Sequence, residues 1–375
     1  MKQEELTSWQ PRHSTALFGH SDAETTLLEA WGSGRLPHGW LITGPRGVGK
    51  ATLAFRFARF LLKHGMPAAD EGPSLFGDAP PKPQSLDVGE DDPVFQRVAN
   101  YGHGDLMTVE RSWDDKQDRW RSEIVVADVR GLIERFAMTA AEGGYRVCVV
   151  DAADEMNTNA ANALLKILEE PPPNAVLLLI SHAPGSLLPT IRSRCRRLAL
   201  KPLAAEPMQQ ALAGLLPDVT GAERQALGVI AEGSPGRAAL LAGQGGLDLL
   251  RDWLDLIAGL PQPDIAKLHS LGDKLGRATG AAAFAVLAEL FQWWLARLIR
   301  AAAAHRAGGA GWVEIYPGEA ALAAKMASWQ APDRWAEDWD TIGRLLERGE
   351  SVNLDRKQML LNIFATLGRA AQSSR

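Results

Sequence analysis

The chain has 375 residues, of which 46% are hydrophobic and 23% are charged, with a net charge of −5. This composition supplies apolar side chains for a sizeable core and excludes global disorder, and the length predicts about two or three domains. A chain that coats nucleic acid by bulk positive charge is also excluded. The 2 cysteines, Cys148 and Cys195, exclude a disulfide framework and a four-cysteine zinc module, and they favour a reducing, cytoplasmic compartment.

The hydrophobic pattern divides the chain into three regions. Residues 1–202 alternate short apolar runs with helical patterns, which predicts an α/β domain with a parallel sheet. An insertion rich in Pro, Gly and charged residues interrupts this domain at about 65–121. Residues 203–246 carry only short helical patterns, and residues 247–375 are rich in Ala and Leu and helical throughout.

The longest apolar stretch, residues 278–304, has the length of a membrane span. The polar and charged residues that interrupt it are Glu289, Gln292, Arg297 and Arg300. We therefore interpret it as a long buried helix. The polar start of the chain, residues 1–11, is not typical of a signal peptide, and we expect a cytoplasmic protein without a membrane partner.

A glycine-rich loop follows a predicted strand at 39–43 and precedes a predicted helix at 50–62. The loop reads Gly44-Pro45-Arg46-Gly47-Val48-Gly49-Lys50-Ala51. In a P-loop, backbone N–H groups and the helix N-terminus attract phosphate, and Lys50 would reach the outer phosphates. The hydroxyl that holds Mg²⁺ in such loops is missing at Ala51, and Thr52 comes one residue too late. The sequence therefore predicts a P-loop fold with impaired binding of Mg-ATP.

A second buried strand, residues 145–151, ends in a carboxylate. Because ligands bind beyond the carboxyl ends of parallel strands, Asp151 is placed where it would position Mg²⁺. The next residue is Ala152, where an ATPase of this type carries a glutamate that orients the attacking water. We interpret Asp154 and Glu155, further along, as a solvated acidic end of the loop.

The following segment predicts a helix at 158–169, stopped by three prolines, and a strand at 175–180. His182, just after that strand, is a candidate phosphate sensor, although such residues more often bond the neighbouring loop. A basic cluster comes next, and its members are Arg192, Arg194, Arg196, Arg197 and Lys201. It is either a solvated, phosphate-attracting face or the place of an arginine finger, a guanidinium that reaches ATP on a neighbouring subunit.

Several of these motifs together resemble one family. In chain order they are Phe18-Gly19-His20, Leu36-Pro37-His38-Gly39, the loop Gly44–Lys50, Asp151, Asn162-Ala163-Leu164-Leu165-Lys166-Ile167-Leu168-Glu169-Glu170-Pro171-Pro172 and Ser193-Arg194-Cys195. The chain resembles the bacterial AAA+ clamp-loader proteins of DNA polymerase III. The resemblance implies an AAA+ P-loop α/β domain at 1–202, a small helical lid at 203–246 and an all-α collar at 247–375.

The resemblance also implies a role. Ala51 and Ala152 imply a stator subunit that does not hydrolyse ATP itself and lends Arg194 as an arginine finger, within a holoenzyme that is a nucleotidyltransferase. The degenerate nucleotide site would consist of Gly44, Gly47, Gly49, Lys50 and Asp151. Implied partners are the motor (gamma/tau) and delta subunits, the sliding clamp and primed DNA. No cofactor is required, ATP with Mg²⁺ would bind weakly, and no zinc is expected because the insertion holds no cysteine.

Two other functions compete with this one. An active AAA+ motor ATPase would need Thr52 and Glu155 to replace the missing groups. A P-loop nucleoside or nucleotide kinase disagrees with the length, with the helical C-terminal third and with the motif Ser193-Arg194-Cys195. Within the helical third, an apolar stripe predicts either a subunit interface or the domain's own core, and its members are Phe291, Trp294, Leu295 and Leu298.

Overall fold

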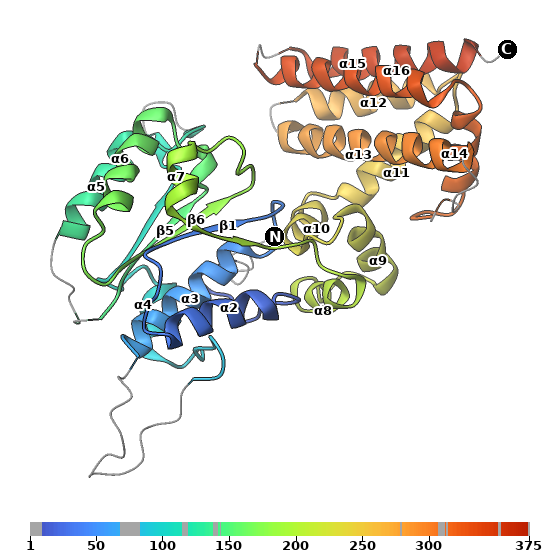
Figure 1. The fold of residues 1–375 in the computed structure, drawn as a ribbon. Helices are drawn as coiled ribbons and strands as arrows, with labels where there is room; N and C mark the ends of the chain where they lie inside the picture. The colour runs from blue at the N-terminus through green and yellow to red at the C-terminus, as the bar shows by residue number, and fades with distance from the viewer. Residues whose placement is uncertain are drawn as a thin grey trace, which may run out of the picture. The chain divides into compact units, whose positions relative to one another are not determined.

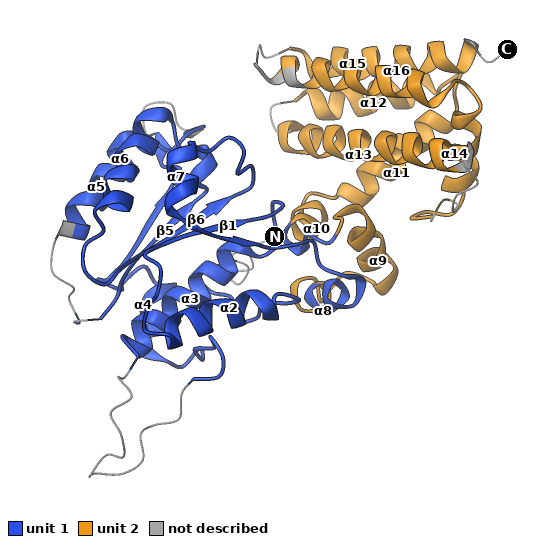
Figure 2. Ribbon diagram, in the orientation of Figure 1, with its two compact units in different colours: residues 1–211, 233–236 blue, residues 212–232, 237–375 orange. Residues whose placement is uncertain are grey.

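The structure is a computed structural model that describes residues 10–67, 83–114, 119–137, 142, 144–277, 280–306, 312, 314–351 and 354–373. Its residues group into two compact units, 1–211 with 233–236 and 212–232 with 237–375 (Figure 2). Two parts of the predicted insertion, 68–82 and 115–118, lie outside the described residues. The division into three domains remains a prediction.

A parallel sheet of five strands forms the centre of the first unit. The strands are β1 (Gly39–Thr43), β2 (Leu106–Glu110), β5 (Arg146–Asp151), β6 (Ala175–Ser181) and β7 (Arg196–Ala199), in the order β2-β5-β6-β1-β7. The three strands predicted from apolar runs are confirmed. They are almost entirely buried, because a parallel sheet covered on both faces excludes water from both sets of side chains.

Helices cover both faces of this sheet (Figure 1). One face packs against α2 (Ser21–Gly32), α3 (Lys50–His64) and α4 (Pro93–Ala99), and the other against α5 (Val126–Ala137), α6 (Thr158–Glu169) and α7 (Pro189–Arg194). Side chains alternate along each strand, so Trp40 and Ile42 join the first core while Leu41 joins the second. The fold class predicted for this region is thereby confirmed.

Several shorter elements also occur before the helical region. Strands β3 (Trp113–Asp114) and β4 (Arg119–Trp120) pair antiparallel within the predicted insertion. A 3₁₀ turn, η1 (Ala153–Glu155), follows β5. Helix α8 (Ala205–Leu215) holds the boundary between the two units.

The second unit is helical in all its described elements. They are α9 (Gly221–Ile230), α10 (Pro235–Gly243), α11 (Gly246–Ala258), α12 (Ile265–Gly276), α13 (Ala281–Arg306), α14 (Glu319–Ala327), α15 (Pro332–Ser351) and α16 (Arg356–Ser373). The apolar stripe of α13 is at most 1% exposed. Trp253 of α11 stacks edge-on against Phe291 of that stripe at 5.0 Å. The stripe is therefore core of its own unit, and its interpretation as a subunit interface is wrong.

Helix α13 is also long and apolar enough to cross a membrane over Ala281–Ala304, the one such helix among the described residues. Half of that stretch is buried inside the protein. Phe291 and Trp294 of this helix pack against Trp253 and Trp312 of the same unit, as aromatic residues of a core helix do. We interpret α13 in this way, as the sequence predicted.

Candidate nucleotide site and arginine finger

The glycine loop joins β1 to α3 in the geometry of a P-loop. Gly44, Gly47 and Gly49 all adopt positive φ angles, of 150°, 78° and 111°. A Cβ on Gly44 would lie 2.5 Å from the carbonyl oxygen of Leu200, so no larger residue fits there. The loop thus needs its glycines, as the sequence predicted.

Lys50 does not extend out of this loop. Its Nζ donates hydrogen bonds to the carbonyl oxygens of Gly44 at 2.7 Å and Pro45 at 2.6 Å. The residue is 3% exposed, and burial lowers the pKa of the ammonium to about 8. The loop's own carbonyl oxygens therefore take two of the three N–H donors of the ammonium, which leaves one for a phosphate.

Asp151 lies at the carboxyl end of β5, in register with Glu110 at the end of β2. Burial, followed by repulsion from Glu110, raises the pKa of Asp151 to about 6. The next side chain is the methyl group of Ala152, which is 2% exposed. The structure therefore brings Asp151 to the predicted edge of the sheet, but the residue that directly follows it carries no carboxylate.

Asp154 and Glu155 are not the solvated loop end that the sequence suggested. An oxygen of Asp154 accepts the backbone N–H of His182 at 2.9 Å. Glu155 forms ion pairs with Arg46 of the P-loop at 2.8 Å and with Arg111 at 2.9 Å. Both carboxylates tie the carboxyl ends of the strands together. Glu155 is thus occupied by two cations rather than free to act as a base.

His182 lies close to this network. Burial, followed by the charge of Lys50, lowers the pKa of its imidazole to about 4, so the ring is neutral at pH 7. Its Nδ1 is buried without a hydrogen-bond partner among the described residues. A neutral ring near the P-loop lysine agrees with a phosphate sensor, and that role remains a prediction.

The segment 233–236 packs directly on the P-loop. The N–H of Gly236 donates to the carbonyl oxygen of Gly47 at 2.9 Å, and a Cβ on Gly236 would lie 2.9 Å from the Gly47 Cα. A side chain larger than hydrogen at position 236 would therefore collide with the backbone of the P-loop. Arg237, the next residue, forms an ion pair with Glu289 at 2.7 Å inside the helical unit. Together with Ala51, this arrangement fits Mg-ATP poorly.

The arginines of the basic cluster each make different contacts. Arg196 lies over the ring of Trp40, with its Cζ 5.1 Å from the ring centroid, and Arg197 donates to the Thr43 hydroxyl at 3.4 Å. Arg192 is exposed and forms no ion pair within the described part of the chain. Arg194 is the last residue of α7 and forms an ion pair with Glu169 at 2.8 Å.

Arg194 lies at the amino edge of the sheet, where its parallel strands begin. The P-loop lies at the carboxyl edge, where these strands end. Trp40 is paired with Arg196 and Thr43 with Ala199, so the amino ends of β1 and β7 coincide. A Cβ on Gly39, where β1 begins, would lie 3.2 Å from the Arg194 carbonyl oxygen. The P-loop follows the other end of β1, roughly 13 Å further at about 3.3 Å per residue. Arg194 is therefore remote from the nucleotide site of its own chain.

Comparison with known proteins identifies the family. A sequence model described as DNA polymerase III, delta subunit, matches residues 82–204. The delta' subunit of DNA polymerase III from Pseudomonas aeruginosa is 30% identical over 332 residues, which cover 86% of this chain and 89% of that protein. The chain belongs to the delta' subunits of DNA polymerase III.

Two other similarities accompany this one. The gamma/tau subunit of DNA polymerase III from Mycobacterium bovis is 31% identical over 208 residues, covering 55% of this delta' chain and 31% of that longer protein. A solved structure of a gamma subunit-related protein from Thermotoga maritima covers 93% of this chain and all of that one, with a TM-score of 0.46 and 17% identity.

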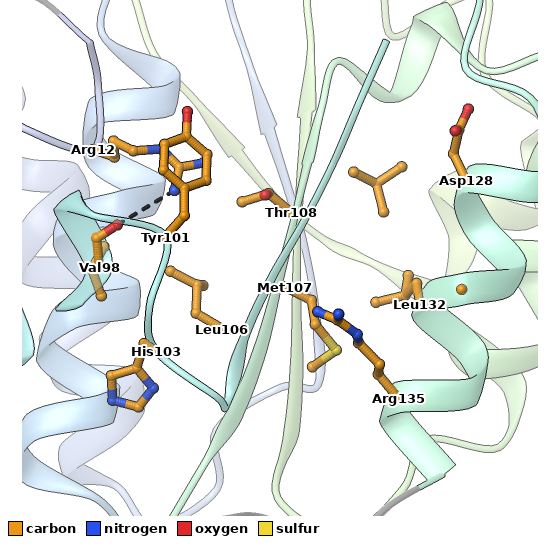
Figure 3. Close-up of a pocket in the computed structure, with 12 residues that line it drawn as sticks. Arg12, Val98, Tyr101, His103, Leu106, Met107, Thr108, Asp128, Leu132 and Arg135 are labelled. Atoms are coloured by element: carbon orange, nitrogen blue, oxygen red, sulfur yellow. Dashed lines mark hydrogen bonds between the residues drawn. The ribbon is translucent and has the colours of Figure 1, made fainter. Parts of the chain in front are cut away.

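The delta' chain also contains a cavity that sequence reasoning missed. It has a volume of about 350 Å³ and follows the edge strand β2, between α5 and the end of α4 (Figure 3). Arg12 borders it, with its Cζ 3.4 Å from the ring centroid of Tyr101, and donates to the Val98 carbonyl oxygen. None of the predicted site residues lines this cavity. No motif marked it, because residues from distant segments create it.

A group near this cavity has the spacing of a metal site. Its members are His103, Asp105 and Glu142, whose ligand atoms lie within 4.8 Å of one another. The Nδ1 of His103 accepts the N–H of Asp105 at 3.3 Å, so the proton of the neutral ring is on Nε2, the atom that faces Glu142. Arg97 binds both oxygens of Glu142. These hydrogen bonds disfavour a metal here, and the expectation of no zinc remains a prediction.

Proposed function

We propose that this chain is the stator subunit of the DNA polymerase III clamp loader and lends Arg194 in trans to ATP on a neighbouring gamma/tau-type subunit. The observation that carries the proposal is the position of Arg194, at the amino edge of the sheet. Its own P-loop lies at the carboxyl edge. A guanidinium there can stabilise phosphoryl transfer only at a nucleotide that another chain presents.

The second half of the proposal is that the chain does not hydrolyse ATP itself. Ala51 supplies no Mg²⁺ ligand, and Ala152 supplies no carboxylate to orient water. Lys50 is bonded to the carbonyl oxygens of its own loop, and Gly236 packs on that loop. These features support a degenerate site in which ATP and Mg²⁺ bind weakly or not at all. They disfavour a motor ATPase.

The proposed partners follow from this role. They are gamma/tau-type motor subunits, a delta subunit, the sliding clamp and primed DNA, in a cytoplasmic assembly that is part of a nucleotidyltransferase holoenzyme. Residues 247–375 would serve as the collar. Since the described α13 stripe is core, the collar contacts would have to come from other surfaces of this region.

The finger is tested by Arg194→Ala in the reconstituted clamp loader. Folding and assembly should stay near normal, because an exposed arginine contributes little to stability. Hydrolysis should fall by about 10³–10⁵-fold at the one ATP site that the finger serves, with slower clamp loading at limiting ATP. Single-turnover hydrolysis and a clamp-loading assay measure both effects.

Two further variants act as controls for this test. Arg194→Lys should rescue poorly, because an ammonium cannot make the bidentate phosphate contact. Arg192→Ala removes another exposed arginine from the same helix and should act only through general, salt-sensitive attraction. Wild-type clamp loading by Arg194→Ala, together with its loss in Arg192→Ala, would refute the assignment.

A further inference from the structure

We propose that Glu169 is the positioning residue of the arginine finger: its carboxylate holds the Arg194 guanidinium in the orientation in which it meets the neighbouring subunit's phosphate. This inference rests on the proposed function of Arg194. It adds a residue of this chain that acts through the finger and touches no nucleotide itself.

Two bonds from different elements hold the guanidinium. The NH2 group of Arg194 lies 2.8 Å from Oε1 of Glu169, the last residue of α6. The NH1 group donates to the carbonyl oxygen of Thr190 at 3.1 Å, one turn back in α7. Both ends of the planar group are therefore fixed. Of its five N–H donors, those not used in these two bonds remain for a ligand.

Glu169 is itself held in place by the fold. Helix α6 starts after β5, at the carboxyl edge of the sheet, and ends before β6, at the amino edge where Arg194 lies. Asn157 caps its start, and Nε2 of His38 bonds the carbonyl oxygen of Leu168 at 3.1 Å near its end. Leu168 and Ile191 of α7 belong to one buried cluster. The two helix ends that carry the ion pair thus pack against each other.

The pair is poorly suited to stabilising the fold. The side chains of Arg194 and Glu169 are 36% and 50% exposed, and ion pairs with such exposure contribute little. Exposure to solvent does not prevent the ion pair from orienting the Arg194 guanidinium. A free arginine loses much rotamer entropy when it is immobilised, so a side chain that is already oriented binds phosphate at a lower entropic cost.

The chain provides a matched control beside the proposed residue. Glu170 is also exposed, follows directly at the end of α6 and forms no ion pair within the described residues. Replacing it removes the same charge from almost the same place. It leaves the Arg194 side chain fully bonded.

The experiment compares Glu169→Gln, Glu170→Gln, Arg194→Ala and Glu169→Gln/Arg194→Ala in the full reconstituted clamp loader, measuring single-turnover hydrolysis over a range of ATP concentrations. Glu169→Gln should lower the maximal rate at the served site by about three- to tenfold. The ATP concentration for half-maximal rate should stay within about twofold, because the neighbouring subunit's P-loop binds the nucleotide. Glu170→Gln should match wild type.

The double variant separates a positioning role from a structural one. If Glu169 acts only through Arg194, then Glu169→Gln causes no further loss in the Arg194→Ala background. A wild-type or increased rate in Glu169→Gln, or an additional loss in the double variant, overturns the inference while leaving the finger intact. A wild-type rate in Arg194→Ala would instead overturn the proposed function on which it rests.

Discussion

Asp151 is a partly buried carboxylate, and the folded structure disfavours its ionised form. Burial and the neighbouring Glu110 raise its pKa from 3.8 to about 6. The folded chain therefore binds this proton more tightly than the unfolded chain. The resulting stability is fully present below about pH 3.8 and is lost as the pH rises to about 6.

Replacing this carboxylate by an amide removes the penalty. We expect Asp151→Asn to raise the free energy of unfolding at pH 8, by at most about 3 kcal/mol at about 1.4 kcal/mol per pKa unit. The gain should shrink toward zero near pH 4, where the folded wild type is protonated. Urea unfolding at pH 4, 6 and 8 measures it, with the exposed Glu170→Gln as control. A less stable variant at pH 8 would mean that attraction to Lys50 outweighs burial.

The contact between the segment 233–236 and the P-loop requires glycine at position 236, because only a hydrogen atom fits there. A Cβ on Gly236 would lie 2.9 Å from the Cα and 3.1 Å from the carbonyl oxygen of Gly47. Both are backbone atoms of a loop held at its two ends by β1 and α3, so they cannot yield as a flexible side chain would. The contact therefore limits which residues can follow Pro235.

We accordingly expect Gly236→Ala to destabilise the chain by about 1–3 kcal/mol, the usual cost of overpacking. Thermal unfolding of the purified chain measures this change. Gly131→Ala is the matched control: Gly131 lies in α5 of the same unit, and its added Cβ would meet nothing within 4 Å. That variant should be neutral or slightly more stable, since alanine favours helix over glycine. Equal effects of the two substitutions would contradict the tight contact.

The P-loop and Arg194 do not come together in one site within this chain. Ala51 follows the P-loop lysine, Ala152 follows Asp151, and Arg194 lies at the other end of β1 from the P-loop. We expect the purified chain to show no ATP turnover approaching about 1 s⁻¹, the slow end of typical enzymes. A steady-state ATPase assay with Mg²⁺ measures this, with an assembled clamp loader as positive control. A rate near that value from the isolated chain would restore the motor interpretation.

Local sequence signals predicted much of the first unit. The apolar run at 39–43 and the glycines after it determine strand, loop and helix, because each choice depends on neighbouring residues alone. Three prolines end α6 for the same reason. The α13 stripe shows the limit of such signals: the spacing of Phe291 and Trp294 requires an apolar partner but does not say whether that partner is the same chain or another.

The sequence by itself thus determined the P-loop fold, the alanines at positions 51 and 152 and the presence of Arg194 in its motif, since residue identity and spacing carry all three. Only the tertiary structure decided that Lys50 bonds its own loop, that Glu155 is held by two arginines and that Arg194 is held by Glu169 at the amino edge of the sheet. Each of the last two contacts joins segments well separated along the chain. Such pairings depend on strand order and helix packing, which local spacing does not encode.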